Sequence, residues 1–295
     1  MELLHFTGQI WRPPYEASSQ LLQITAGCTH NKCKFCSLYD GTKFRLSPLS
    51  EIEADLNVIR EYQPKARRIF LTGANPFALS FNKLLDLGLL IRKYLPYCET
   101  IGAFSRISDI KAKTVEELKN LRHLGFDSIS IGTETGDDET LTRMNKGNTA
   151  ADTLEQCKKL EEANIRYNLV YLTGLAGKGK GQQNAINTAN LFNQLHPFII
   201  NVVSLTVFPE SELFREIQEG TFTESSEHER LFELKTLLSK LEITTTLLGN
   251  TVSNSIPFTG ILPKDKNEIL KGLDSAMKEI SETKLKQYRD TIRSL

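Results

Sequence analysis

The chain has 295 residues, of which 40% are hydrophobic and 24% are charged. This composition predicts a globular protein with a substantial core and excludes a disordered chain. Lysine and arginine together number 36, as do aspartate and glutamate, and this balance argues against binding nucleic acid through bulk phosphate neutralisation. We therefore expect a small-molecule substrate rather than a nucleic acid.

The sequence shows no membrane or export signal. No apolar run approaches the roughly 18–20 residues that a membrane helix needs. The most apolar stretch, residues 198–208, is interrupted by Asn201, Ser204 and Thr206. The first residues lack the basic and then apolar pattern of a signal peptide. We predict a cytoplasmic protein that does not enter a membrane.

Six short apolar segments have the pattern of strands, and segments with helical spacing separate them. Strands that alternate with helices form a parallel sheet, and right-handed crossovers curl such a sheet toward a barrel. Six units rather than eight predict an α/β protein with a partial (β/α)6, TIM-like barrel. The predicted strands are residues 20–26, 68–72, 100–104, 128–132, 166–173 and 199–207.

Capping signals mark the starts of two of the intervening helices. Thr114 with Glu117 forms a capping box, and Thr149 with Asp152 opens a helix that continues to Asn164. The other predicted helices follow Pro48, start with the acidic residues 137–139, or cover residues 81–93 and 182–195.

The C-terminal part departs from the β/α alternation and predicts a separate region. We expect an N-terminal extension over residues 1–19, the barrel over 20–215 and a capping region over 216–295. The irregular polar stretch 249–260, which contains Ser253 and Asn254, is the expected substrate-facing loop. Around it the sequence predicts an amphipathic helix over 227–241, a β-prone run over 243–248 and a closing helix over 265–280.

Three of the five cysteines lie close together after the first predicted strand: Cys28, Cys33 and Cys36, spaced C-x4-C-x2-C. An odd cysteine count without an export signal argues against a disulfide framework. Three thiolates can hold three irons of a cubic 4Fe–4S cluster and leave the fourth iron open, as catalytic metal sites require. With His30 the same segment offers a Cys3His set, so a structural zinc site is the alternative.

The other cysteines and two neighbouring lysines have simpler expected roles. Cys98 and Cys157 are expected to be buried in the structure, as small hydrophobic side chains. Lys32 and Lys34 are expected to help keep the clustered thiols deprotonated.

The cysteine segment resembles the cluster loop of radical S-adenosylmethionine (radical SAM) enzymes, in which a spacing of four residues between the first two cysteines recurs in a subset. The resemblance covers residues 20–215, and the barrel is most similar to the elongator, MiaB and NifB grouping. It implies one 4Fe–4S cluster held by Cys28, Cys33 and Cys36, with S-adenosylmethionine as the second cofactor. It also implies reductive cleavage to a 5′-deoxyadenosyl radical that abstracts hydrogen from an unidentified substrate, and a low-potential electron donor such as ferredoxin or flavodoxin.

The same resemblance assigns cofactor contacts to residues near the strand ends. Phe35 resembles an aromatic residue that packs on the adenine, Glu134 an acid that binds the ribose or the amino group, and Arg143 an arginine that pairs with the carboxylate. The remaining implied contacts are Gly73, Ala74 and Asn75 after the second strand, Ser105 after the third and Gly174 after the fifth.

Two features leave alternatives open. Asn75 stands where the family often has a glutamate, so a plain Asn-Pro turn and a non-catalytic, cluster-binding sensor are the alternatives. Lys178 and Lys180 lie among glycines and are expected to form a mobile, solvated loop, with contact to an anionic substrate group as the alternative.

Overall fold

The computed structural model of the chain describes residues 4–292, which fold into two compact units. The first unit contains the residues up to Asn31, Leu38–Gly132 and Gln156–Tyr167. The second contains Lys32–Ser37, Thr133–Glu155 and the residues from Asn168 onward. The chain passes from one unit to the other within the cysteine segment, β6 (Ile129–Glu134), α6 (Ala150–Glu162) and β7 (Tyr167–Thr173).

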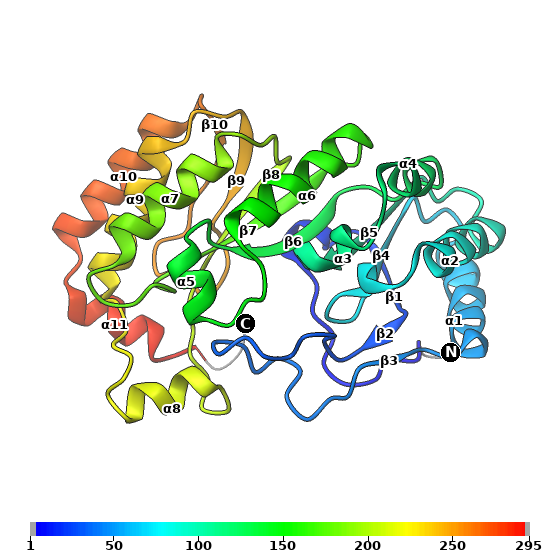
Figure 1. Cartoon of the computed structure of the whole chain (residues 1–295), viewed down its shortest axis with the longest axis horizontal. Helices are drawn as coiled ribbons and strands as arrows, with labels where there is room; N and C mark the ends of the chain where they lie inside the picture. Colours follow the sequence, from blue (N-terminus) through cyan, green and yellow to red (C-terminus); the bar gives the residue numbers. More distant parts are fainter. Residues whose placement is uncertain (1–3, 293–295) are drawn as a thin grey trace. The chain divides into compact units, whose positions relative to one another are not determined.

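The first unit is a parallel sheet covered by helices. Its strands pair in the order β1 (Gln20–Gln23), β4 (Arg68–Thr72), β5 (Thr100–Ser105) and β6. The largest of its helices lie side by side along these strands (Figure 1). They are α1 (Leu49–Tyr62), α2 (Phe81–Tyr94) and α4 (Val115–His123); the short elements are η1 (Pro14–Glu16), η2 (Pro76–Ala78) and α3 (Ile107–Lys111).

The first predicted strand is shorter than expected. β1 ends at Gln23, and Thr25–Ala26 form β2, which pairs antiparallel with β3 (Arg45–Leu46). The break falls at Ile24 because its carbonyl accepts a hydrogen bond from the Ser47 N–H (3.0 Å) rather than continuing the parallel ladder. The cysteine segment is therefore an excursion that leaves and returns through a two-stranded ribbon.

The second unit continues the β/α pattern and ends in an antiparallel strand. β7 (Tyr167–Thr173), β8 (Ile199–Ser204) and β9 (Thr245–Leu248) are parallel, and β10 (Thr259–Leu262) pairs antiparallel with β9. Three long helices pack against one another beside them (Figure 1). These are α7 (Gly181–Phe192), α9 (Glu227–Lys240) and α10 (Lys266–Glu279); the short helices are α5 (Asp138–Arg143), α8 (Glu212–Gln218) and α11 (Glu282–Arg289).

Several predicted boundaries differ from the structure. The last strand of the six ends at Ser204, because the Leu205 carbonyl accepts from the guanidinium groups of Arg230 (2.9 Å) and Arg289 (3.1 Å). The prediction of an irregular stretch over 249–260 is wrong at its C-terminal end, because Thr259 begins β10. The sequence analysis also missed α8 and α11, short helices in which only Leu213 and Leu285, respectively, are buried.

Other local predictions are confirmed. Thr114 and Glu117 form the reciprocal capping box of α4. Thr149 Oγ1 accepts from the Asp152 N–H (3.0 Å), and the Asp152 carboxylate accepts from the Thr149 N–H (3.0 Å). Cys98 and Cys157 are buried, and burial raises the pKa of both thiols. They are inert core side chains.

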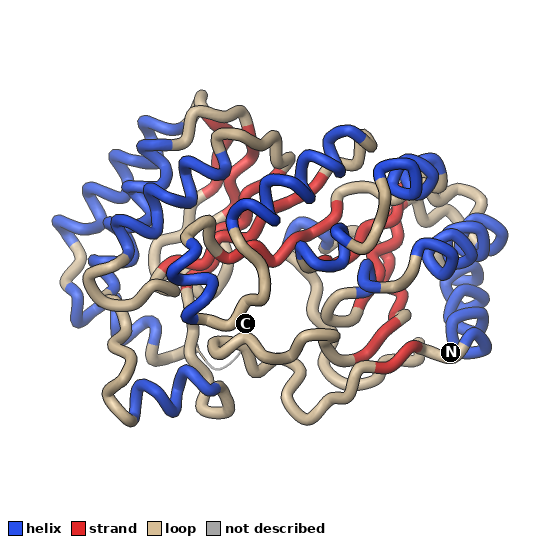
Figure 2. The backbone as a smooth tube through the Cα atoms, in the orientation of Figure 1, coloured by secondary structure: helices blue, strands red, loops and turns tan. Residues whose placement is uncertain are grey.

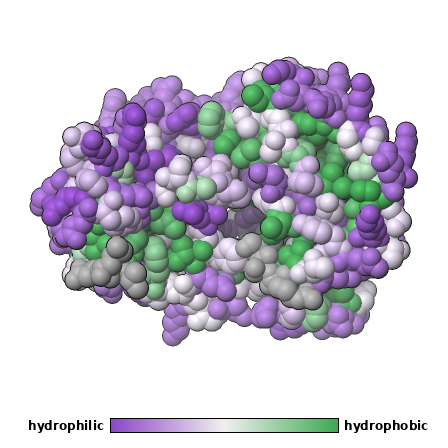
Figure 3. Space-filling view, turned by 180° about the vertical axis from the view of Figure 1, so that it is seen from behind, coloured by the Kyte–Doolittle hydropathy of each residue, from purple (hydrophilic) through white to green (hydrophobic). Residues whose placement is uncertain are grey.

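The surface mixes polar and apolar residues, as the face in Figure 3 shows. Single exposed apolar side chains are ordinary on folded proteins. Within residues 4–292, no helix combines the length and the apolar composition that crossing a membrane requires.

Candidate cluster and cofactor site

Residues 27–44 connect β2 to β3 as a long loop without helix or strand (Figure 2). Its three cysteines are half-buried thiols rather than disulfides. Cys28 Sγ accepts a hydrogen bond from the Asn31 N–H (3.4 Å), and Asn31 adopts a left-handed backbone with φ of 45°. The Cys36 N–H donates to the Cys33 carbonyl (3.1 Å). Both ends of the cysteine motif are thus held in local turns.

Glycine is required where the loop begins. Gly27 has φ of 73°, and a Cβ there would lie 2.7 Å from the Thr42 carbonyl oxygen. A side chain at this position would clash with backbone atoms that cannot move easily. The end of the loop, near Thr42, therefore packs against Gly27, the residue immediately before Cys28.

The donor set fits an iron–sulfur cluster, because cysteine thiolates are its usual ligands and each one binds a separate iron. Zinc instead requires its ligands around a single ion. His30, the fourth donor of the zinc alternative, is half-buried.

Lys34 anchors the loop in the second unit. Its N–H donates to the Met144 carbonyl (3.1 Å), and its carbonyl accepts from the Leu213 N–H (2.8 Å). Its ammonium lies 2.6 Å from Glu216 Oε1 and 3.3 Å from Glu212 Oε1, and the hydrogen bond to Glu216 raises the pKa of Lys34. Its charge is therefore paired with these carboxylates, and the expected role in deprotonating the thiols does not match this arrangement.

Phe35 and Arg143 also have protein partners. Phe35 packs against an apolar cluster that includes Met144 and Phe222. The Arg143 guanidinium lies 2.6 Å from Glu216 Oε2 and 5.6 Å from the centre of the Phe222 ring. Its hydrogen bond lowers the pKa of Glu216. For Arg143 to bind a cofactor carboxylate, it would have to exchange Glu216 for it.

Glu134, which the family resemblance implies as a cofactor contact, has a strained backbone and a paired carboxylate. It is the last residue of β6 and has φ of 67°, a left-handed conformation that costs roughly 1–3 kcal/mol for residues other than glycine. Its carboxylate lies 3.1 Å from the ammonium of Lys146, and both side chains are largely buried. Such strain is concentrated at binding sites.

The implied contacts after β4 and β5 lie in the first unit. Gly73 has φ of 122° and rests directly on Thr25, and Ala74 is half-buried beside it. Asn75 is buried and bonded to neighbouring loops. Ser105 is also buried, and its hydroxyl donates to the Arg106 carbonyl (2.9 Å).

Gly174 follows β7, and its N–H donates to Glu233 Oε2 (2.8 Å). Glu233 is fully buried in α9 and also accepts from the Tyr171 hydroxyl (2.6 Å) and Asn184 Nδ2 (2.8 Å). Burial raises the pKa of both Glu233 and Tyr171. The buried Glu233 carboxylate therefore fixes the Gly174 turn, which the family resemblance implies to face the adenine.

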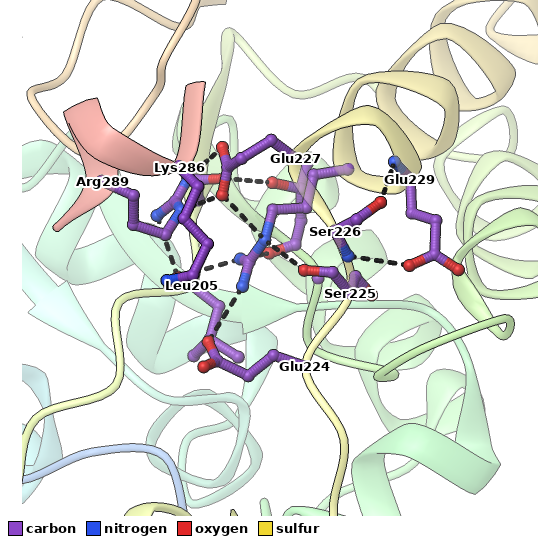
Figure 4. A network of polar contacts seen from close by, with 12 residues as sticks. Leu205, Glu224, Ser225, Ser226, Glu227, Glu229, Lys286 and Arg289 are labelled. Atoms are coloured by element: carbon purple, nitrogen blue, oxygen red, sulfur yellow. Dashed lines mark hydrogen bonds and ion pairs between the residues drawn. The ribbon is translucent and has the colours of Figure 1, made fainter. Parts of the chain in front are cut away.

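Arg230 on the same helix holds the neighbouring strand ends. It is buried and donates to the Thr173 carbonyl (3.3 Å) and the Leu205 carbonyl (2.9 Å). Around it, Arg289 pairs with Glu227, while Glu224 and Ser225 lie in the preceding segment (Figure 4). The sequence analysis missed Arg230 and Glu233. The sequence signal for Arg230 was its spacing from Leu234, which places both residues on the same, buried face of α9.

Two further expectations concern polar loops. The Lys178 N–H donates to the Thr223 carbonyl (2.9 Å), and the exposed ammonium of Lys180 pairs with Glu139. In the expected substrate-facing stretch, Ser253 Oγ accepts from the Ser204 N–H (3.1 Å). Asn254 Nδ2 donates to the Val202 carbonyl (2.8 Å). Ser253 and Asn254 are buried against β8, so that expectation is wrong for these side chains.

Because of Lys113, the free energy of unfolding is expected to change with pH in the alkaline range. Its buried ammonium donates to the carbonyls of Phe77 (2.7 Å) and Asp109 (3.0 Å), and burial lowers its pKa to about 8. Because the pKa of the folded state is below the unfolded value, the folded state gains stability as pH rises from about 8 toward 10.5. We expect the unfolding free energy of the parent, relative to Lys113→Met, to rise by about 2 kcal/mol between about pH 7 and about pH 10.

Denaturant titration of both proteins at the two pH values measures this difference. Taking the difference cancels the titration of the other lysines, which both proteins share. A constant difference across this range would show that Lys113 keeps its ordinary pKa in the folded protein.

The fold and the three-thiol loop are those of an α/β protein that binds a metal cluster. The family model described as the radical SAM superfamily matches residues 22–191, and this chain belongs to that superfamily. The match confirms the predicted family, and its members are enzymes that bind a 4Fe–4S cluster and S-adenosylmethionine, the two expected cofactors.

Individual relatives share part of their length with this chain. The heme chaperone HemW of Bacillus subtilis (strain 168) is 24% identical over 200 residues, which are 66% of this chain and 52% of HemW. The chain thus spans about half the length of this curated relative.

Solved structures of radical SAM proteins confirm the fold class. The radical S-adenosylmethionine methyltransferase TsrM from Kitasatospora setae has a TM-score of 0.55 and 17% identity, covering 68% of this chain and 39% of TsrM. Coproporphyrinogen III oxidase (HemN) from Escherichia coli has a TM-score of 0.54 and 16% identity, covering 75% of this chain and 51% of HemN. The predicted partial barrel of parallel strands is the fold that these proteins share.

Proposed function

We propose that this chain is a radical SAM enzyme that holds one 4Fe–4S cluster through Cys28, Cys33 and Cys36. The observation that carries the proposal is the trio of half-buried thiols in a long loop within the segment that matches the family. When bound, the cluster and S-adenosylmethionine supply a 5′-deoxyadenosyl radical that removes a hydrogen atom from the substrate.

The residues of this chain hold and orient these groups. The turn at Asn31 and the backbone bonds of Lys34 fix the two ends of the cysteine motif. The Glu134 carboxylate can accept hydrogen bonds from hydroxyl or ammonium groups of the nucleotide, in exchange for Lys146. The buried Glu233 keeps the Gly174 turn in place for the adenine.

The substrate and the electron donor are proposed at the level of their chemistry. The balanced charge of the chain favours a small molecule over a nucleic acid. The low potential of such clusters requires a strong cytoplasmic reductant such as ferredoxin or flavodoxin. The named relatives are a heme chaperone, a methyltransferase and an oxidase, so the proposal concerns the radical chemistry that their family shares.

Anaerobic reconstitution with iron and sulfide tests the proposal. We expect a brown protein with about four irons per chain, and release of 5′-deoxyadenosine with dithionite and S-adenosylmethionine. One tightly bound zinc and no colour would instead identify a Cys3His site with His30. An intact cluster without cleavage would indicate a sensor. Either result would reject the proposal.

A further inference from the structure

Three loops of the first unit meet at the side chain of Asn75, which is 1% exposed. Its Nδ2 donates to Thr29 Oγ1 (2.6 Å) and to Asp109 Oδ2 (3.0 Å), and its Oδ1 accepts from the Thr29 N–H (3.2 Å). Both amide protons are therefore used, and Thr29 directly follows Cys28. The loop after β4 is bonded to the Cys28 end of the cysteine loop.

Asp109 fixes the far end of this chain of hydrogen bonds. Its Oδ2 also accepts from the Arg106 N–H (2.8 Å), in the capping box of α3. Lys113 holds its carbonyl, and the residue is 5% exposed. A buried polar network whose members are all bonded makes its surroundings rigid. The position of Thr29 is therefore set by elements outside its own loop.

A second contact joins the same two loops. Gly73 has φ of 122°, and a Cβ at this position would collide with the Thr25 hydroxyl and carbonyl. The loop after β4 therefore touches the chain on both sides of Gly27, at Thr25 and at Thr29. At Thr29 the loop after β4 contributes the Asn75 side chain, which can be exchanged, whereas at Thr25 it contributes the backbone of Gly73.

We propose that Asn75 and Asp109 are positioning residues that hold Cys28 in place through Thr29, and that Asn75 does not contact the cofactor. This inference rests on the proposed function, in which Cys28 binds the cluster. It replaces the role that the family resemblance implies for Asn75, because the side chain that would face the cofactor is bonded to Thr29 and Asp109.

The chemistry of the bridge explains why this position carries an amide. The Asp109 carboxylate can only accept hydrogen bonds, so its partner must donate. An aspartate at position 75 would place two carboxylates against each other. An asparagine at position 109 would keep the bridge, because its amide oxygen can accept from both Asn75 Nδ2 and the Arg106 N–H.

The test compares Asn75→Ala, Asn75→Asp, Asp109→Ala and Asp109→Asn after anaerobic reconstitution. We measure the rate of iron release to a chelator and the reduction potential of the cluster. We expect iron release about tenfold faster in both Asn75 variants, with a shifted potential. We expect Asp109→Ala, which removes the acceptor, to release iron faster as well. Asp109→Asn should stay within about twofold of the parent, because its amide oxygen can still accept from Asn75 and the Arg106 N–H.

Asp127→Asn is the matched control. Asp127 is a buried carboxylate of the same unit that accepts from the Arg166 N–H (2.9 Å), and it lies before β6 rather than after a strand. This variant is expected to lower the melting temperature of the apoprotein without changing iron release. It separates a general loss of stability from a loosened Cys28.

Three outcomes would overturn the inference. The first is parental iron release in both Asn75 variants, and the second is parental iron release in Asp109→Ala. If Asn75→Ala fails to fold, Thr29→Val tests the same bond at an exposed residue, and parental iron release there is the third. A parent that takes up no cluster would instead overturn the proposed function, and this inference with it.

Discussion

Cys33→Ala is expected to abolish cluster assembly and cofactor cleavage together. Two thiolates would then have to hold a cubane that needs three protein ligands, and the middle cysteine of the motif has no neighbour to replace it. Iron content should fall from about four per chain to a trace, and 5′-deoxyadenosine should fall to background. Iron analysis and chromatography of the anaerobic reaction measure both quantities.

Cys157→Ala is the matched control for this prediction. Cys157 is fully buried in α6, and burial raises its pKa, so it supplies no thiolate. Its removal should leave the iron content unchanged and lower stability by about 1–2 kcal/mol through the small cavity created. Full iron loading of Cys33→Ala, or loss of iron from Cys157→Ala, would contradict the assignment of the cluster ligands.

The parallel strands could be predicted because buried strands leave continuous apolar runs in the sequence. Residues 68–72 are an example, since four of the five residues of β4 are buried. Boundaries could not be predicted where side chains from distant segments replace the ladder. The end of β8 depends on Arg230 and Arg289, which lie on helices far along the chain.

In the candidate site, too, local features could be predicted from the sequence and contacts between distant segments could not. The spacing of the cysteines is local, and the sequence therefore predicts the cluster loop directly. The partners of Asn75, Arg143 and Phe35 come from other elements, and no local pattern indicates them. Arg143 has helical neighbours that suggest an exposed charge, yet its guanidinium pairs with Glu216 of α8, a helix that the sequence analysis did not predict.

Charged residues on the buried face of α9 were the hardest to anticipate. An amphipathic pattern predicts that the apolar face is apolar throughout. Glu227, Arg230 and Glu233 nevertheless lie buried among the leucines of that helix. Arg230 and Glu233 satisfy backbone groups at the ends of β7 and β8, and Glu227 pairs with Arg289. This requirement is visible only after the strands and the helix are placed together.

Glu233→Ala is expected to lower the free energy of unfolding by about 3–5 kcal/mol, the cost of removing one member of a buried charged network. The substitution leaves the Tyr171 hydroxyl, Asn184 Nδ2 and the Gly174 N–H without their shared acceptor in a site closed to water. Each unsatisfied buried donor is costly. Denaturant titration of the apoprotein measures the loss without depending on the cluster.

Two further variants show whether the loss arises from these hydrogen bonds. Glu233→Gln keeps an acceptor for Tyr171 and Asn184 but turns an amide N–H toward Gly174, so we expect a smaller loss of about 1–2 kcal/mol. Lys235→Ala removes a half-exposed ion pair with Asp274 from the same helix and should cost less than about 1 kcal/mol. Equal losses in all three variants would show that α9 is sensitive to any substitution. The graded series would show instead that Glu233 holds the Gly174 turn through its acceptor oxygens.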